Sequence, residues 1–451
     1  MNTHMDTYKV KRLKRTEDIV VEVPGSKSIT NRALLLAALS DGITTLKGTL
    51  FSDDSRHFIS SLISLGFKVD IDEKSHTVKV EGRGGAIPKC EGTADVGSAG
   101  TAARFITAML GLSEGCYIIN ASEQMQKRPM EPLFRALEAI GAEFEYLGES
   151  YHLPVRVKGC RYKTKTNVSN KKEIVHITLD TNESTQYLSA MLMTGIMNKG
   201  GIAIHVTGER KTGSYVDITR GMMEEFGCKT EYKDETYFIY DNERYRTGNF
   251  TYQIEPDVSA ACYFYGIGAL LGIKATVKNV HFNSTQGDIQ FIRALEKMGC
   301  RVSDNEEGIE VQGPKNGKRL KGIDIDMKTF SDQALTMAAI SIFAEGDTNI
   351  RNIGHIRKQE SDRLSAIAAE LKRMGIECEE KEDSITIHSG TPLPCLIETY
   401  DDHRVAMAFT LVGLVIEGIE ISNPMCCRKT FENYFDVIES LYQDKPTLFL
   451  K

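Results

Sequence analysis

The chain has 451 residues, more than one hydrophobic core usually organises, so its length alone predicts two or more domains. Hydrophobic residues make up 41% and charged residues 26%, with 38 Gly and 11 Pro, which excludes extended disorder and collagen-like order. The net charge of −7 excludes the overall basic field that attracts nucleic acid. Any bound anion must therefore be held by cations that the fold gathers locally.

The cysteine and histidine patterns give no support for a metal or redox site. The ten cysteines form no Cys-x-x-Cys pair, and the ten histidines show no His-x-x-x-His spacing. No run of about 18 apolar residues occurs, and the basic segment 9–15 is not followed by an apolar stretch. We therefore expect a cytoplasmic protein with reduced thiols, without a membrane partner and without a metal.

In chain order, an almost wholly apolar helical pattern recurs six times, each time ending at a glycine before a β-like run. These glycines, separated by 73, 86, 71, 74 and 72 residues, are Gly42, Gly115, Gly201, Gly272, Gly346 and Gly418. An amphipathic helical pattern follows each one; the first five end at Gly66, Gly141, Gly227, Gly299 and Gly375, and the sixth covers 431–442. The chain is thus interpreted as six copies of one α/β unit.

A helix that is apolar on every side must be enclosed by protein, whereas an amphipathic helix can lie at a surface. We therefore predict one buried and one outer helix in each copy. An ordinary doubly wound sheet also alternates strands and helices and is the alternative. The usual ligand motifs of such a sheet are missing. No Gly-x-Gly-x-x-Gly follows a strand, and the segment 24–28 lacks the Gly-Lys pair and the earlier glycine of a P-loop.

Polar residues open the predicted buried helices, which begin near Ser28, Thr101, Thr185, Ser259, Ser331 and Asp402. A helix N-terminus offers unpaired N–H groups and partial positive charge, which favour phosphate or carboxylate by about 1 kcal/mol. Several such ends, together with arginines, could hold a polyanion. The simpler interpretation, that hydroxyls such as Ser28, Thr101, Ser184 and Ser331 only cap helices, stays open at this point.

Three loop segments carry further candidates. Arg128 stands in Lys-Arg-Pro before an outer helix, and Lys429 lies immediately before the last helix. The segment 357–363 is predicted to start another outer helix, on which Glu360 and Arg363, three residues apart, would share a face. Each could instead be an ordinary solvated turn or cap residue.

These segments resemble, in order and over nearly the whole chain, the family of 5-enolpyruvylshikimate-3-phosphate synthase. The matching segments are Pro24 to Ser28 with Asn31 and Arg32, 97–104, Lys127 to Pro129, Ser184 to Gln186, Tyr215 to Thr219, Ser331 and Asp332, 359–363, Asp402 to Arg404, and Lys429 to Phe431. No single segment is specific, but nine of them in order are.

The resemblance implies a two-domain inside-out α/β barrel of six βαβαββ repeats, three per domain. Residues 1–23 with 254–451 would form one half and residues 24–253 the other. The buried helices would point their N-termini into an interdomain cleft that holds the active site and closes on substrate.

The resemblance also implies the reaction. The enolpyruvyl group of phosphoenolpyruvate would pass to the 5-hydroxyl of shikimate 3-phosphate, and phosphate would leave from a tetrahedral intermediate. This is a step of the shikimate pathway towards chorismate and the aromatic amino acids. It requires an acid, a base and anion stabilisation but no cofactor. We expect a cytoplasmic monomer whose partners are these two small molecules, without nucleic acid.

Carried over residue by residue, the resemblance assigns three sets of site residues. The phosphoenolpyruvate contacts are Lys27, Gly100, Arg128, Gln186, Arg363, Arg404 and Lys429. The shikimate 3-phosphate contacts are Ser28, Arg32, Ser184, Thr185, Gln186, Thr212, Tyr215, Asp332, His355 and Gln359. Asp332 is the candidate base for the 5-hydroxyl and Glu360 the candidate proton donor, while Lys27 would assist either step.

The chain departs from the family pattern mainly on the acceptor side. Gln359 stands where Lys is common, His355 where Asn is common, and Ser98 where Asn often stands. Thr185 and Thr212 replace serines but keep the hydroxyl. In the phosphoenolpyruvate set, Gly100 leaves the space that glyphosate needs, so we predict inhibition by it, although Phe105 stands where Pro is frequent.

Two other functions fit the sequence less well. The related transferase that acts on UDP-N-acetylglucosamine carries a catalytic Cys five residues before the arginine that matches Arg128, where this chain has Glu123. A non-catalytic protein that binds anions or RNA ends would gain nothing from keeping Asp332 and Glu360. The sequence therefore favours the shikimate-pathway reaction.

Overall fold

The computed structural model describes residues 7–14, 17–160, 173–315 and 317–443. Its contacts divide the chain into two compact units: unit 1 is Met1–Pro24 with Glu255–Lys451, and unit 2 is Gly25–Ile254. Each break lies one residue further along the chain than the sequence predicts. Among the described residues, no helix combines the length and the apolar character that crossing a membrane requires.

The described residues of unit 2 form three four-stranded sheets, each with one parallel pair and two antiparallel pairs. The strands, in sheet order, are β14 (Phe250–Gln253), β3 (Asp41–Lys47), β5 (Thr77–Arg83) and β4 (Lys68–Asp72); β6 (Glu91–Asp95), β7 (Cys116–Asn120), β9 (Val155–Lys158) and β8 (Glu143–Tyr146); and β10 (Val175–Asp180), β11 (Ile202–Thr207), β13 (Thr236–Ile239) and β12 (Glu231–Lys233).

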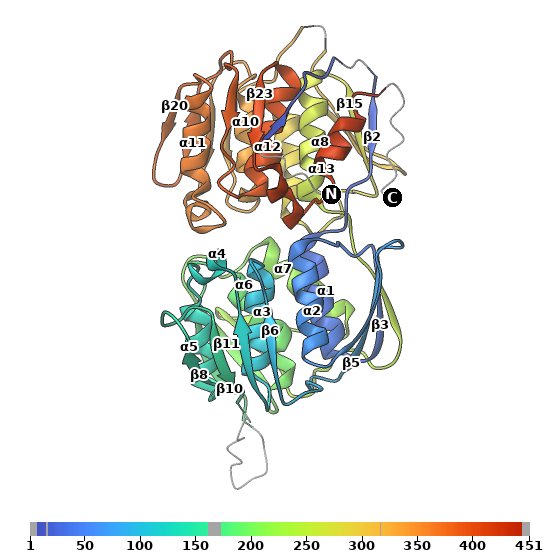
Figure 1. Cartoon of the computed structure of the whole chain (residues 1–451), viewed down its shortest axis with the longest axis vertical. Helices are drawn as coiled ribbons and strands as arrows, with labels where there is room; N and C mark the ends of the chain where they lie inside the picture. Colours follow the sequence, from blue (N-terminus) through green and yellow to red (C-terminus); the bar gives the residue numbers. More distant parts are fainter. Residues whose placement is uncertain (1–6, 15–16, 161–172, 316, 444–451) are drawn as a thin grey trace. The chain divides into compact units, whose positions relative to one another are not determined.

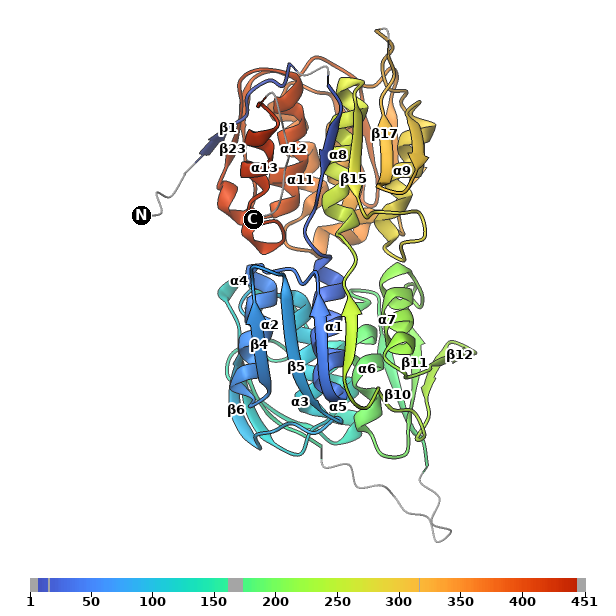
Figure 2. The same cartoon turned by 90° about the vertical axis from the view of Figure 1, so that its right-hand side faces the viewer.

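The helices of unit 2 follow the predicted alternation of buried and outer helices. The buried helices are α1 (Lys27–Leu39), α3 (Gly100–Gly111) and α6 (Gln186–Thr194). The outer helices are α2 (Asp53–Ser64), α5 (Glu131–Ile140) and α7 (Ser214–Glu225), with short turns at α4 (Glu123–Gln126) and η1 (Gly195–Met197). Helices α1 and α2 both contact the sheet that contains β3 to β5 (Figure 2).

Unit 1 repeats the arrangement with two four-stranded sheets and one three-stranded sheet. Their strands are β16 (Arg301–Asp304), β17 (Gly308–Gln312), β15 (Lys274–Lys278) and β2 (Ile19–Val21); β18 (Asp324–Asp326), β19 (Thr348–Arg351), β21 (Ile385–Ile387) and β20 (Cys378–Glu380); and β1 (Thr7–Lys9), β23 (Ile419–Ser422) and β22 (Cys395–Ile397). The helices are α8 (Val258–Leu271), α9 (Gln290–Lys297), α10 (Ala334–Ser341), α11 (Arg363–Arg373), α12 (His403–Val415) and α13 (Tyr434–Ser440). The described part of unit 1 also has the 3-10 turns η2 (Gly287–Ile289), η3 (Ser331–Gln333), η4 (Gly354–Lys358) and η5 (Pro424–Lys429).

The βαβαββ order is visible along the chain, for example from β10 through α6, β11, α7 and β12 to β13. Where the chain passes from one unit to the other, two strands pair within a different repeat from the helix that follows them in the sequence. Strand β2 precedes α1 but pairs with β15 of unit 1, and β14 precedes α8 but pairs with β3 of unit 2. Two repeats are therefore each completed by a strand from a distant part of the sequence.

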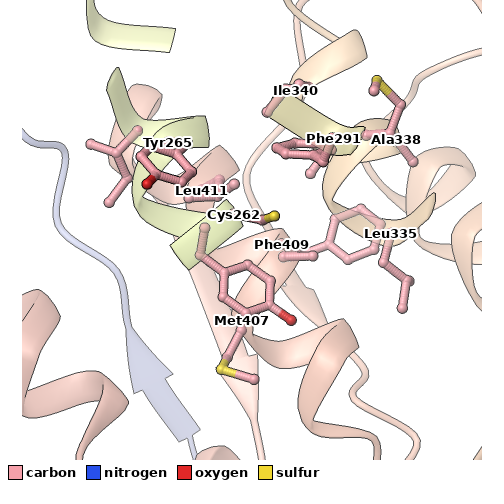
Figure 3. Packing of buried hydrophobic residues seen from close by; sticks show 14 of the residues in the cluster. Cys262, Tyr265, Phe291, Leu335, Ala338, Ile340, Met407, Phe409 and Leu411 are labelled. Carbon is pink, nitrogen blue, oxygen red and sulfur yellow. The ribbon is translucent and has the colours of Figure 1, made fainter. Parts of the chain in front are cut away.

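Burial explains the two helix types. Every residue of α3 and of α10 is buried, whereas α2 and α9 bury one face. In unit 1, α8, α10 and α12 lie side by side (Figure 1). Their apolar side chains interdigitate with one another and with Phe291 of α9 (Figure 3). This packing fixes the positions of the helix starts, and so of the polar residues there.

The predicted glycine stops of the outer helices are confirmed. Gly66, Gly141, Gly227, Gly299 and Gly375 have φ between 73° and 107°, the left-handed region that ends a helix. Gly115 is different, because its φ is not positive. A Cβ there would lie 2.2 Å from Tyr117 Oη and 2.4 Å from the carbonyl oxygen of Cys90, so close packing requires this glycine.

Candidate active site

In unit 1, the starts of three buried helices meet at one arginine. Arg404, in the first turn of α12, donates from Nη2 to Ser259 Oγ of α8 at 3.3 Å and to Asp332 Oδ2 of η3 at 3.2 Å. Turn η3 leads directly into α10. The polar residues that the sequence places at separate helix starts are therefore neighbours in unit 1.

A second arginine joins this cluster from α11. Arg363 donates from Nη1 to Asp332 Oδ1 at 3.0 Å, and from Nε and Nη2 to both oxygens of Asp402 at 2.7 and 3.2 Å. Burial alone would lower the pKa of Arg363, but the Asp402 and Asp332 carboxylates raise it above its usual value. Burial would likewise raise the pKa of Asp402, and Arg363 holds it below the usual value. Opposite charges thus stabilise each other between two side chains that are almost fully buried.

The structure corrects the prediction for Glu360. It lies in the loop between η4 and α11, because α11 begins only at Arg363 with Asp362 as its N-cap, so Glu360 and Arg363 do not share a helix face. Glu360 Oε2 lies 3.0 Å from His403 Nδ1 and 3.8 Å from Lys429 Nζ. This carboxylate therefore belongs to the same cluster by its loop, not by helical spacing.

Lys429 is held towards the cluster by a turn in a rare backbone conformation. Its Nζ donates to the carbonyl oxygen of Asp401 at 3.2 Å and lies 3.6 Å from the carboxylate of that residue. Tyr400 and Asp401 have φ of 53° and 54°. Non-glycine residues in the left-handed region are uncommon and concentrate at functional sites.

Two of the acceptor-side departures, His355 and Gln359, lie near the candidate base. His355 Nε2 is 2.7 Å from Ser331 Oγ, and Gln359 accepts a hydrogen bond from Arg363. Both residues therefore contact neighbours of Asp332.

Among the described residues of unit 1, one group of side chains is close enough together to hold a metal ion. One ligand atom each from Glu360, Asp402 and His403 lies within 4.8 Å of the others. Both oxygens of Asp402 already accept from Arg363, and Lys429 lies near Glu360. A divalent ion would have to compete with these two cations, so the residues fit an ion-pair network better than a metal site.

Unit 2 gathers cations in a different way. Arg32 of α1 is fully buried and donates from Nε to Thr219 Oγ1 at 2.8 Å, and from Nη2 to Ser189 Oγ and to the carbonyl oxygen of Tyr215 at 3.2 and 3.3 Å. It also bonds the carbonyl oxygen of Ser28, and burial lowers its pKa to about 10. Within the described residues, every hydrogen-bond acceptor of Arg32 is neutral.

The start of α3 adds two more arginines. Arg104 donates from Nη1 to the carbonyl oxygen of Gly100 at 3.1 Å, and burial followed by the charge of Arg128 lowers its pKa to about 10. Its Nε has no hydrogen-bond partner among the described residues. A Cβ on Gly100 would lie 2.8 Å from Arg128 Nη1, so Gly100 admits the two guanidinium groups to the helix start.

The other sequence candidates of unit 2 lie at or near helix starts. Lys27 Nζ is 3.5 Å from Asp54 Oδ2, while Gln186 opens α6 with its Oε1 buried and without a hydrogen-bond partner in the described chain. Thr185 is the N-cap residue of α6. Thr212 is exposed in the turn before α7.

The capping interpretation holds for one hydroxyl of the four. Ser184 Oγ accepts from the backbone N–H of Gln186 at 3.1 Å. The N-caps of α1 and α3 are Ser26 and Ala99, neither with a side-chain cap bond. Thr101 Oγ1 instead accepts from Asn31 at 2.6 Å, while Ser331 bonds His355.

Sequence reasoning missed two buried carboxylates beside these groups. Asp54 looks like a routine acidic residue in the first turn of α2 but pairs with Lys27. Asp288 lies in η2, distant in sequence from the buried helix starts, but accepts from Ser259 at the start of α8 and from Gln333 at the start of α10. Neither has a spacing signal that singles it out.

The comparisons with known proteins decide the family. The sequence model described as EPSP synthase (3-phosphoshikimate 1-carboxyvinyltransferase) matches residues 10–438. The 3-phosphoshikimate 1-carboxyvinyltransferase of Nostoc punctiforme is 40% identical over 96% of this chain and 98% of its own. That of Vibrio campbellii is 39% identical over 93% of this chain and 96% of its own. This chain belongs to the EPSP synthase family.

Solved structures agree with this fold. EPSP synthase from Acinetobacter baumannii superposes with a TM-score of 0.77 at 23% identity, covering 95% of this chain and 97% of that one. The enolpyruvyl transferase NikO from Streptomyces tendae gives a TM-score of 0.73 at 16% identity, covering 96% of each chain. The predicted two-domain α/β fold is confirmed, and the chain is a transferase that moves enolpyruvate from phosphoenolpyruvate to shikimate 3-phosphate.

Proposed function

We propose that Asp332 removes the proton of the 5-hydroxyl and that Glu360 protonates C3 of the enol. The observation that carries this assignment is the difference between their surroundings. Asp332 accepts from two arginines, whereas Glu360 faces His403 and Lys429. Two carboxylates in different electrostatic surroundings can hold opposite protonation states at one pH, as an acid and a base must.

The addition and elimination steps then balance. The 5-hydroxyl oxygen bonds to C2 of phosphoenolpyruvate while its proton passes to Asp332, and C3 takes a proton from Glu360. In the second step C3 returns a proton to Glu360, the double bond re-forms and the bond from C2 to the phosphate oxygen breaks. The phosphate takes the proton that Asp332 removed from the 5-hydroxyl, so both carboxyl groups regain their starting forms. Lys27 would assist either proton transfer, and the phosphate leaves as an anion that cations must stabilise.

Two sets of residues are proposed, one to bind each substrate. Phosphoenolpyruvate would be bound by Arg363, Arg404 and Lys429 of unit 1, with Arg128, Lys27, Gly100 and Gln186 of unit 2. Shikimate 3-phosphate would be bound by Arg32, Ser28, Ser184, Thr185, Gln186, Thr212 and Tyr215, with Asp332, His355 and Gln359. Neutral acceptors around Arg32 support this, because its positive charge is left for a ligand anion.

The assignment of Glu360 is tested by phosphate release. Purified protein given phosphoenolpyruvate and shikimate 3-phosphate should release phosphate, and UDP-N-acetylglucosamine should not replace the acceptor. Glu360→Gln should lower kcat by roughly a hundredfold to ten-thousandfold, the usual contribution of a general acid. Glu296→Gln, which alters a half-buried glutamate of α9 paired with the exposed Arg293, is the matched control. Unchanged turnover in Glu360→Gln would remove that residue from the mechanism.

The proposal also covers the cooperation of the two halves, the location and oligomeric state of the protein, and inhibition by glyphosate. We infer that the halves predicted from the sequence act together on one pair of substrates in an interdomain cleft, so that variants in either unit should impair the same transfer. We also propose a cytoplasmic monomer, to be checked by light scattering for the mass of one chain. Glyphosate should inhibit, since Gly100 carries no side chain, and an enzyme indifferent to millimolar glyphosate would reject this.

A further inference from the structure

Asp288 is a buried carboxylate that the proposed mechanism does not use. It lies in η2, immediately before α9, and is 6% exposed. Its Oδ2 accepts from Ser259 Oγ in a short hydrogen bond and from Gln333 Nε2 at 2.8 Å. Both donors are neutral, so no cation in direct contact compensates this charge in the described chain. A buried, unpaired carboxylate is costly, and such sites often have a function.

Three hydrogen bonds, through Ser259 and Arg404, link Asp288 to the candidate base Asp332. Ser259 Oγ, which donates to Asp288, accepts from Arg404 Nη2 at 3.3 Å. The same Nη2 donates to Asp332 Oδ2 at 3.2 Å. Asp288 therefore orients the hydroxyl of Ser259, because that hydroxyl must point its hydrogen at the carboxylate and its lone pairs at the arginine. The direction of Arg404 towards Asp332 follows from it.

Charged and titratable groups face Asp288 from three elements. Arg404 comes from α12 and favours the ionised form, while Asp332 comes from η3 and opposes it. The thiol of Cys262 on α8 donates to the backbone oxygen of Asp288 at 3.7 Å, and burial raises the pKa of that thiol well above its usual value, so it stays neutral. Burial, more than these charges, raises the pKa of Asp288 to about 6.

We propose that Asp288 is a positioning residue for the transfer reaction: through Ser259 it holds Arg404 against Asp332, and its charge competes with Asp332 for that arginine. This inference rests on the proposed roles of Asp332 and Arg404. It separates into two parts, which different variants test: the hydroxyl relay through Ser259 and the negative charge at position 288.

The charge is tested by the pH profile of kcat/KM for Asp288→Asn. Asparagine keeps the shape and still accepts from Ser259, so Arg404 keeps its partners. Wild-type Asp288 takes up its proton as the pH falls through about 6, so its charge acts on Arg404 and Asp332 only above that pH. The acidic limb of the wild type should therefore include a step near pH 6 that is missing in Asp288→Asn, which displaces the limb by about half a unit or more. Asp324→Asn, which neutralises an exposed aspartate of the same unit that is paired with Arg351, should leave the limb in place.

The relay is tested at Ser259. Ser259→Ala removes the acceptor of Arg404 and should raise KM for phosphoenolpyruvate about fivefold, the equivalent of one hydrogen bond. Ser259→Thr keeps the hydroxyl and should restore the wild-type KM. A merely structural role would lower the melting temperature of these variants without moving the limb or separating Ala from Thr.

Asp332→Asn distinguishes a failure of the proposed role of Asp332 from a failure of the positioning role of Asp288. If this variant keeps wild-type kcat, the proposed role of Asp332 is wrong whatever Asp288 does. If Asp332→Asn is inactive while folded Asp288→Asn keeps the acidic limb of the wild type, the positioning role of Asp288 is overturned. Should Asp288→Asn fail to fold, equal KM values for Ser259→Ala and wild type would overturn it instead.

Discussion

The candidate site regions of the two units hold their arginines in opposite ways. In unit 1, Arg363 and Arg404 bond carboxylates, and those carboxylates raise the pKa of Arg363. In unit 2, Arg32 and Arg104 are equally buried but bond carbonyl oxygens, hydroxyls or sulfur, and burial lowers the pKa of each to about 10. These two arginines of unit 1 thus have carboxylate partners, whereas Arg32 and Arg104 of unit 2 have neutral hydrogen-bond partners, so that their positive charge is available for an anion.

This difference suggests a division of labour. Paired carboxylates and arginines hold acid and base groups at fixed distances, which proton transfer requires. Cations with neutral partners pay a desolvation cost in the unliganded protein that a bound phosphate or carboxylate relieves. The four predictions below test the comparison, from the largest expected effect to the smallest.

Removing Arg363 should have the largest effect on stability. Arg363→Met leaves Asp402 buried without its cation and takes one of two arginines from Asp332, so we expect the free energy of unfolding to fall by about 3–5 kcal/mol. Urea unfolding measures it. The control is Arg351→Met, which breaks the exposed pair with Asp324 and should change stability by about 1 kcal/mol or less. Equal effects in the two variants would show that burial of the pair does not matter.

Removing Arg32 should cost binding and not stability. Arg32→Met deletes a buried cation whose partners are neutral, so we expect stability to change by about 1 kcal/mol or less. KM for shikimate 3-phosphate should rise roughly tenfold to a hundredfold, the value of charge-assisted hydrogen bonds to an anion. Steady-state kinetics with varied acceptor and urea unfolding provide the two measurements. A stability loss as large as that of Arg363→Met would erase the contrast between the units.

A single methyl group at position 100 tests the cation pair of unit 2. The new Cβ of Gly100→Ala would lie 2.8 Å from Arg128 Nη1 and 3.1 Å from Arg104 Nη1, so at least one guanidinium must move. We expect KM for phosphoenolpyruvate to rise roughly tenfold, because small displacements of binding groups are costly, while kcat changes less. Gly221→Ala, whose Cβ would meet nothing within 4 Å, is the control. An unchanged KM in Gly100→Ala would place the phosphoenolpyruvate phosphate elsewhere.

The repeats and the polar residues at the starts of the buried helices could be predicted from the sequence, because the pattern of apolar helices and glycines is periodic. Six apolar helices spaced by glycines predict the repeats, and the polar residues that open them, such as Lys27, Asp332 and Arg404, follow from that frame. The outer-helix glycines are confirmed by their positive φ values. The family resemblance added the assignment of each residue to a substrate.

What the sequence could not predict are contacts set by loops and by distant segments. Glu360 reaches His403 and Lys429 from a loop, and helical spacing therefore gave the wrong neighbour for it. The strand exchange of β2 and β14 depends on pairing across more than two hundred residues of sequence, as between Val20 and Thr276. Asp288 was missed because a buried carboxylate in a 3-10 turn has no pattern in sequence.

The smallest predicted effect concerns stability and pH at Asp288. Its pKa in the folded chain is about 6, above the ordinary value of 3.8, so between these values the folded state binds more protons than the unfolded state. Stability from this group is therefore greatest at low pH and is lost as the pH rises through about 6. At neutral pH the ionised carboxylate destabilises the fold, and Asp288→Asn should recover part of that loss, about 1 kcal/mol after its weaker hydrogen bonds are considered.

The dependence on pH distinguishes this mechanism from a general change in packing. The gain for Asp288→Asn over wild type should be largest at pH 7 to 8 and should shrink as the pH falls through about 6, where the wild-type carboxyl becomes protonated. Thermal unfolding of both proteins between pH 5 and 8 measures it. The Asp324→Asn control should show no gain at neutral pH, because its carboxylate is ion-paired with Arg351. A variant that is more stable but has a displaced pH profile of kcat/KM would show that unit 1 keeps one uncompensated charge for catalysis, just as unit 2 keeps its cations for binding. A difference in stability that is constant with pH would show instead that Asp288 is fully ionised throughout and that its neighbours compensate its charge.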